Sequence, residues 1–130
     1  MAATELFEVV TGGGITTPQG YQAAGVHCGL KRVRHDLALI LSATPAACAG
    51  VFTTNLVKGA PVIWTKKVVK KGIARAIVVN SGNANTCNGP QGLADATRMA
   101  HLTAELNNLS PEQVIVSSTG VIGMPLDMGK

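Results

Sequence analysis

A stretch of 21 residues without a charged side chain, residues 37–57, constrains the fold of this 130-residue chain more than any other feature. Its length would allow a helix to span a membrane. Pro45 and several polar residues interrupt it, however, and its β-branched residues favour strands. We therefore expect two buried strands, at residues 37–42 and 49–53, joined by a turn at Thr44 and Pro45, and no association with a membrane.

Charged residues are scarce along the whole chain. They make up 14% of the sequence, against roughly 25% in an average soluble domain, whereas 46% of the residues are hydrophobic. This composition excludes a disordered chain, which needs low hydrophobicity and high charge. It also leaves too few charges for a fully solvated small surface. Either both faces of a sheet are covered, or much of the exterior is buried against another chain.

The net charge of +4 raises the question of a nucleic-acid partner. The basic residues form two short runs, at residues 31–35 and 66–71, and only four aromatic residues are available to stack on bases. Such runs are typical of a solvated turn or helix face, so we expect no nucleic-acid partner. Residues 1–10 contain two Glu and no basic residue, unlike a secretory signal, which predicts a cytoplasmic location.

The three cysteines do not form a recognisable chemical motif. Cys28, Cys48 and Cys87 lie 20 and 39 residues apart, without a Cys-x-x-Cys pair. This spacing predicts three small buried thiols rather than a disulfide framework or a zinc site.

The rest of the sequence alternates between strand and helix patterns. Further strands are expected at residues 6–10, 21–30, 73–80 and 114–117, and helices at residues 60–71 and 91–107. The turns between the first strands are too short for crossovers, which favours antiparallel pairing there. No repeat or linker divides the chain, so we expect one domain over residues 1–130.

Two loops at the ends of apolar strands are candidates for chemistry, since nucleotide-phosphate motifs and a Gly-x-Ser-x-Gly elbow are absent. Residues 80–90 contain four Asn and two Gly, and form either a ligand-facing loop or a turn that needs these residues for backbone reasons. Residues 117–120 place the Thr119 hydroxyl before the Gly120 amide. Two such donors aimed at one point stabilise the oxygen charge that develops during acyl transfer, and a plain turn is the alternative.

Four blocks of the sequence, in the same order, resemble the ornithine acetyltransferase family. They include GITTPQGY from Gly14, GVFTTN from Gly50, VVNSGNAN from Val78 and STGVIG from Ser118. The resemblance extends from about Gly14 to the last residue. It implies an α/β fold, a layered sandwich of mixed β-sheets between helices, of which this chain forms one part.

The resemblance also implies an activity. Members of this family act in arginine biosynthesis as glutamate N-acetyltransferases, which move the acetyl group of N2-acetylornithine to L-glutamate, and some accept acetyl-CoA as donor. Their precursor cleaves itself before a Thr, which becomes the N-terminal nucleophile of a β chain. Transfer through an acetyl-Thr ester needs no metal or organic cofactor. By this resemblance, the Thr119 hydroxyl and the Gly120 amide form the oxyanion hole, residues 80–90 are scaffold, and the partner is a β chain in an (αβ)2 heterotetramer.

The family pattern is only partly present in residues 1–130. The family's α chain should continue beyond Lys130 to substrate-binding Thr and Lys residues and to the cleavage point. We therefore expect a single, incomplete α-chain domain that lacks the nucleophilic Thr and is inactive without its β chain. The alternatives are an inactive fragment or binding subunit, and a related N-terminal-nucleophile aminopeptidase in which water replaces glutamate as acceptor.

Overall fold

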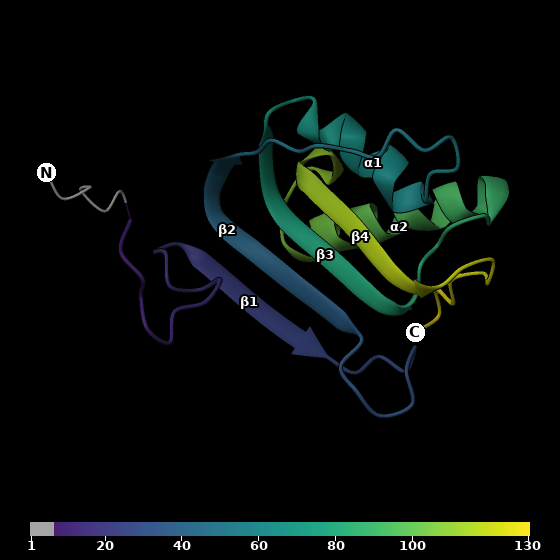
Figure 1. The fold of residues 1–130 in the computed structure, drawn as a ribbon, viewed down its shortest axis with the longest axis horizontal. Coiled ribbons are helices and arrows are strands. Elements are labelled where there is room, and N and C mark those ends of the chain that lie inside the picture. The colour runs from purple at the N-terminus through teal and green to yellow at the C-terminus, as the bar shows by residue number, and fades with distance from the viewer. Residues whose placement is uncertain (1–6) are drawn as a thin grey trace, which may run out of the picture.

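The computed structural model describes residues 7–130, and it has the mixed α/β fold that the sequence predicts (Figure 1). The elements follow in the order β1 (Tyr21–Val26), β2 (Leu37–Ala47), α1 (Ala60–Val69), β3 (Ile73–Asn83), α2 (Gly89–Leu106), the 3-10 helix η1 (Pro111–Gln113) and β4 (Val114–Val121). Both predicted helices are confirmed within about two residues at each end.

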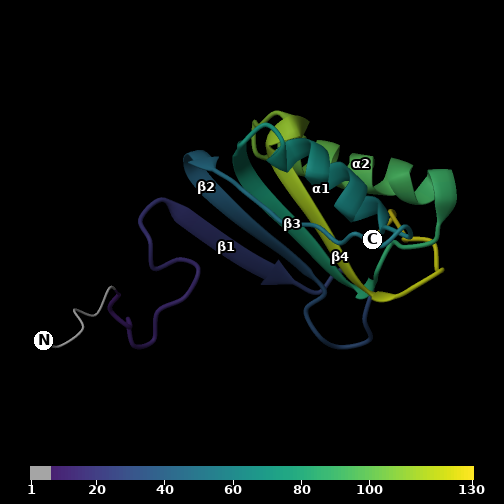
Figure 2. The same ribbon diagram turned by 45° about the horizontal axis from the view of Figure 1, so that its top comes forward.

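The four strands form one mixed sheet in the order β1-β2-β3-β4. β1 and β3 each pair antiparallel with β2, as expected for the first strands, whereas β3 and β4 are parallel. Helix α2 lies between β3 and β4 in the chain, and such a crossover is what a parallel pair requires. Both helices lie on one face of the sheet in both views (Figures 1 and 2). We call this the helix face, and the opposite one the open face.

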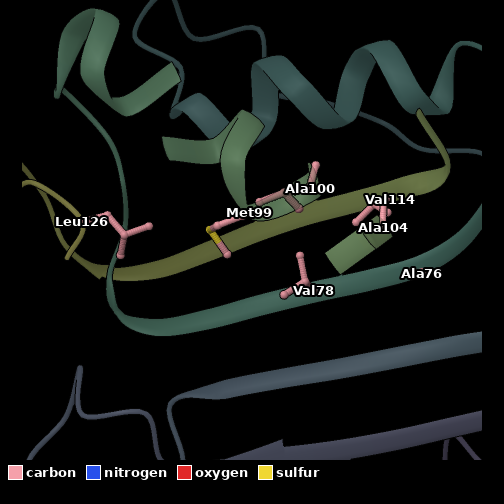
Figure 3. Packing of buried hydrophobic residues seen from close by; sticks show 8 residues of the cluster. Ala76, Val78, Met99, Ala100, Ala104, Val114 and Leu126 are labelled. Atoms are coloured by element: carbon pink, nitrogen blue, oxygen red, sulfur yellow. The ribbon is translucent and has the colours of Figure 1, made fainter. Parts of the chain in front are cut away.

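The hydrophobic core lies between the helix face and helix α2 (Figure 3). Small side chains let the helix approach the sheet closely, since Ala96, Ala100 and Ala104 recur at every fourth position and are at most 1% exposed. Met99 packs in the same layer. The buried cluster comprises Ala76, Val78, Met99, Ala100, Ala104, Val114, Val116 and Leu126.

Helix α1 runs along strand β4 and satisfies backbone groups of that strand. The Thr65 hydroxyl donates to the Val116 carbonyl at 2.7 Å and accepts from the Val116 N–H at 3.1 Å. Trp64 donates its indole N–H to the Val114 carbonyl at 2.9 Å. An unpaired strand edge can pair with other chains, so these bonds protect β4 at Val114 and Val116.

The predicted turn at Thr44 and Pro45 is wrong, because β2 continues through both residues to Ala47. Proline lacks the N–H that a strand ladder needs. The strand β1, which pairs with β2, begins at Tyr21 opposite Ser42, so its pairing does not reach Pro45. The register with β3 also shifts in this region, and Pro45 therefore lies in a β-bulge where no ladder bond needs its nitrogen. Arg75 closes the bulge by donating to the Ser42 carbonyl at 3.1 Å and to the adjacent Ala43 carbonyl at 2.6 Å.

Other details also differ from the sequence-based expectations. Residues 49–53 form no strand, and β1 ends at Val26 instead of residue 30. Of the strand predicted at residues 6–10, Leu6 lies outside the described residues, and residues 7–10 form no strand. Cys87 is exposed rather than buried, and Cys28 and Cys48 are half-buried. No helix within residues 7–130 is long and apolar enough to cross a membrane.

Candidate active site

Thr119 and Gly120 lie within strand β4, close to its end. The sequence predicts that this strand stops at Ser117, but it continues to Val121 because its pairing with β3 also continues. Both residues are exposed. The prediction that they occupy the carboxyl end of an apolar strand is correct, and the strand itself holds their backbone.

A close contact with β3 explains why residue 120 is a glycine. Gly120 is the register partner of Gly82, and a Cβ on Gly120 would lie 2.3 Å from the Gly82 carbonyl carbon. The φ angles are +134° at Gly120 and +119° at Gly82, and side chains rarely allow either value. The two glycines therefore let the parallel strands approach and fix the backbone amide of Gly120. Sequence reasoning missed Gly82, because only the register reveals this contact.

The strand pattern places Thr119 on the open face of the sheet. In β3 the residues of the helix face, such as Val78 and Asn80, are buried, and those between them are half-exposed. Paired residues on neighbouring strands share a face, so Thr119 lies with its partner Ser81 on the open side. The same rule assigns a largely apolar set to this face: Ala38, Ile40, Ile77, Val79, Ile115, Ser117 and Thr119.

Asparagine side chains of residues 80–90 stabilise the ends of these strands through hydrogen bonds to nearby backbone groups. The Asn80 side chain donates to the Asn83 carbonyl at 2.8 Å, and the Asn83 side chain donates to the Met124 carbonyl at 2.8 Å. Asn85 is fully buried, has a φ of +45°, and donates to the Gly92 carbonyl at 2.8 Å. These side chains bind backbone groups of their own surroundings, so the structure favours scaffold over a ligand-facing loop.

A second loop approaches the same end of the sheet, between β1 and β2. The Asp36 carboxylate is buried and accepts backbone N–H bonds from Cys28 at 2.6 Å, Gly29 at 3.2 Å and Lys31 at 2.7 Å. Burial raises the pKa of this carboxyl, but the N–H groups of Lys31 and Cys28, then the Cys28 thiol and last the nearby His27, outweigh burial and hold the pKa well below its usual range. Asp36 therefore stays ionised and fixes the loop conformation.

A cavity of about 470 Å³ lies between the sheet and the second half of α2. Leu37, Leu39, Val78 and Met99 are among its lining residues, whereas Thr119 and Gly120 are not. Ligand sites usually combine an apolar lining with a few convergent polar groups. The lining of this cavity is largely apolar, and its two charged residues, Asp127 and Lys130, pair with each other at 3.6 Å, so we do not assign chemistry to it.

The geometry provides two hydrogen-bond donors at one exposed strand end, a hydroxyl and an amide. Such a pair can stabilise an oxyanion, whereas a threonine hydroxyl attacks a carbonyl only when an adjacent base accepts its proton. Within residues 7–130 no group of three or more His, Cys, Asp or Glu residues comes together to hold a metal ion.

Comparison with known proteins shows the family of the chain. The model of the ArgJ family matches residues 22–130. The chain belongs to the ArgJ family. Membership confirms the resemblance that the four sequence blocks carry, and it extends over all of the strands and helices except the first residue of β1.

Relatives of this ArgJ-family chain are named arginine biosynthesis bifunctional protein ArgJ. The protein from Thermotoga neapolitana is 54% identical over 115 residues, which cover 87% of this chain and 29% of the relative. The protein from Caldanaerobacter subterraneus is 53% identical over 118 residues, covering 91% and 29%. The chain thus spans about 29% of the length of these curated relatives.

Two solved structures share the fold of the ArgJ-family chain. The arginine biosynthesis bifunctional protein of Bacillus halodurans superposes with a TM-score of 0.90 at 41% identity, covering 92% of this chain and 63% of that one. The ornithine acetyltransferase of Mycobacterium tuberculosis, solved with ornithine, superposes with a TM-score of 0.86 at 44% identity, covering 92% of this chain and 66% of that one. These likenesses confirm the predicted fold class.

Proposed function

We propose that this chain is part of the α chain of a glutamate N-acetyltransferase. The enzyme moves the acetyl group of N2-acetylornithine, or of acetyl-CoA, to L-glutamate in the cytoplasm. Residues 1–130 are one incomplete domain of that α chain, and they supply the Thr119 hydroxyl and the Gly120 amide as oxyanion donors. The observation that carries the proposal is the fixed backbone at Gly120 beside an exposed Thr119, in a chain of the ArgJ family.

The proposed reaction has two halves. The hydroxyl oxygen of an N-terminal Thr on a β chain bonds to the acetyl carbon of N2-acetylornithine, while its α-amine accepts the hydroxyl proton. The carbonyl oxygen becomes negative and accepts bonds from the Thr119 hydroxyl and the Gly120 N–H. The C–N bond then breaks, and the proton passes to the departing ornithine amine. In the second half, the amine of glutamate bonds to the acetyl carbon and gives a proton to the α-amine of the Thr, which passes it to the Thr oxygen as the ester C–O bond breaks. No metal or organic cofactor takes part.

A separate β chain is part of the proposal. The chain spans about 29% of its relatives, so most of the enzyme lies outside it. The open face of the sheet carries Thr119 beside apolar side chains such as Ile77 and Ile115, and a partner that covers this face would bring a nucleophile to Thr119. We propose that self-cleavage of a precursor produces the β chain, that two α and two β chains assemble, and that this chain alone is inactive.

Acetyl transfer in the Thr119→Ala variant tests the site. Intact mass of the protein purified from its own gene first establishes which chains accompany this one, and transfer from N2-acetylornithine to glutamate is then measured on that assembly. We expect Thr119→Ala to lower turnover by about 10² to 10³, because one oxyanion donor is lost, with little change in binding of acetylornithine. Thr119→Ser keeps the hydroxyl and should restore most of the activity.

Ser117→Ala is the matched control, since Ser117 is an exposed hydroxyl residue on the same strand and face. It should leave turnover unchanged. A loss below threefold for Thr119→Ala, or an equal loss for Ser117→Ala, would show that Thr119 is not an oxyanion donor. Hydrolysis of acetylornithine without transfer to glutamate would instead identify an enzyme of the aminopeptidase kind, in which water is the acceptor.

A further inference from the structure

The loop between β1 and β2 holds an excess of positive charge in a fixed conformation. We call residues 28–35 the basic loop; Lys31, Arg32 and Arg34 lie within it. The one carboxylate at its base, Asp36, is buried and bonded to three backbone N–H groups of the loop. His27 adds a bond from its ring nitrogen to the Lys31 carbonyl at 2.7 Å. The cations therefore project from a loop that is already ordered.

No acidic side chain neutralises these three cations within residues 7–130. The salt bridges of this part of the chain join His27 to Asp36, Lys71 to Glu112 and Lys130 to Asp127, and none includes Lys31, Arg32 or Arg34. Arg32 and Arg34 are exposed, and Lys31 is half-buried. The basic loop thus offers guanidinium and ammonium donors to an anion that comes from solvent.

The basic loop lies beside the strand ends that carry Thr119 and Gly120. A Cβ on Gly82 would lie 3.3 Å from Cγ of Lys31, so the Lys31 stem rests against Gly82. Gly82 is in turn the register partner of Gly120. The loop therefore contacts the strand next to the candidate oxyanion donor, since Gly82 and Gly120 are separated by one strand spacing, roughly 4.8 Å. Both views place the β1–β2 connection at the sheet end where β3 and β4 finish (Figures 1 and 2).

We propose that the basic loop binds the side-chain carboxylate of the acidic acyl acceptor and so selects glutamate in the second half of the reaction. This inference rests on the proposed function. Glutamate and acetylornithine share an α-carboxylate, but glutamate ends in a second carboxylate and acetylornithine in an ammonium group. A cluster of cations near the acetyl group attracts the first side chain and repels the second. The loop therefore favours the acceptor over re-acetylation of ornithine.

Neutralising the loop in the assembled enzyme tests this selection. Lys31→Met keeps the stem that packs on Gly82, and Arg32→Gln and Arg34→Gln keep long polar side chains while removing charge. In this triple variant we expect kcat/KM for glutamate to fall by about tenfold or more, since hydrogen bonds to a charged group typically contribute that much. We expect kcat/KM for acetylornithine to stay the same or rise. In a ping-pong reaction these two constants report the two halves separately.

The control replaces three lysines at the other end of the sheet with glutamine. Lys66, Lys67 and Lys70 lie in and just after the last turn of α1, near the start of β4, and are exposed. Their triple variant has the same change in net charge and should leave both constants unchanged. If the loop variant does not fold, the single Arg32→Gln variant and a salt titration of the unmodified enzyme replace it. Salt should then lower kcat/KM for glutamate more than for acetylornithine.

Each result of this experiment has one meaning. An equal fall of both constants would show that the loop binds the shared α-carboxylate, and no change in either would show that it binds neither substrate, so both results overturn the inference. If the lysine control lowered kcat/KM for glutamate as much as the loop variant does, the fall would be due to net charge, and this result would also overturn the inference. Absence of any transfer to glutamate in the unmodified enzyme would instead reject the proposed function.

Discussion

Replacing Gly120 with alanine tests the strand contact that fixes the candidate site. The new Cβ would lie 2.3 Å from the Gly82 carbonyl carbon and 2.6 Å from the Asn83 nitrogen, whereas real Cβ contacts are essentially never under 3.0 Å. The backbones must therefore separate by at least about 0.7 Å. Both neighbours are main-chain atoms, so no side chain can rotate away to make room. The strands themselves must move.

The expected loss of stability has two sources. Separating β4 from β3 weakens the ladder hydrogen bonds at this end, and each such bond contributes about 1 kcal/mol. A side chain at a φ of +134° adds backbone strain of about 1–3 kcal/mol. With one or two such bonds weakened, we expect Gly120→Ala to lower the free energy of unfolding by about 2–5 kcal/mol. Urea unfolding followed by the fluorescence of Trp64, the single tryptophan, measures this loss because Trp64 is bonded to β4.

Gly123→Ala is the matched control for the strain alone. Gly123 also has a positive φ, +79°, but no atom lies within 4 Å of the position that a Cβ would occupy, and its N–H keeps its bond to the Thr86 carbonyl. We expect a loss of about 1–2 kcal/mol there. The difference between the two variants isolates the clash with Gly82. Equal losses would refute the reasoning from the contact.

The remaining predictions concern the loop anchor and the strand edge. The folded-state pKa of Asp36 lies below its unfolded value of about 3.9, so its charge stabilises the fold above that pH and the contribution is lost as the pH falls through the folded value. Asp36→Asn should lower the urea midpoint at pH 7, and the difference should shrink below about pH 4; a constant difference would contradict this. Thr65→Val removes both bonds to Val116 and should cost about 2–4 kcal/mol in urea unfolding. Thr97→Val, which loses only a bond to its own helix, should cost under about 0.5 kcal/mol, and similar losses would reject the edge-protecting role.

Local patterns in the sequence were sufficient to predict the helices. Helix α1 combines a proline in its first turn with Gly72 just after its end, and α2 has small residues at helical spacing. The bounds of a strand were less predictable where its pairing with a neighbouring strand determines them. Pro45 indicates a turn by its own chemistry, yet β2 passes through it, because the pairing with β1 extends only to Ser42 and Arg75 satisfies the nearby carbonyls. Neither fact can be read from residues 37–57 alone.

For the candidate site, too, the sequence predicted the local features but not the tertiary contacts. Thr119 and Gly120 follow an apolar strand, and their order of hydroxyl and glycine already indicates a donor pair. The role of Gly82 depends on a parallel register between segments almost forty residues apart, and the position of the basic loop depends on a buried carboxylate at Asp36. Both are tertiary contacts, which spacing along the chain does not encode.

The open face of the sheet is one place where the scarcity of charged residues in the sequence is visible, because its side chains are largely apolar. By register, Ile40, Ile77 and Ile115 lie on this face and are half-buried. Both helices lie on the opposite face of the sheet (Figure 2). Thr119 lies on this face, and a hydroxyl surrounded by water stabilises an oxyanion weakly because water competes for it. A partner that buries the isoleucines would also exclude water from Thr119 and strengthen its bond to the oxyanion. The apolar surface that favours association would thus also provide the dry surroundings that the proposed chemistry needs.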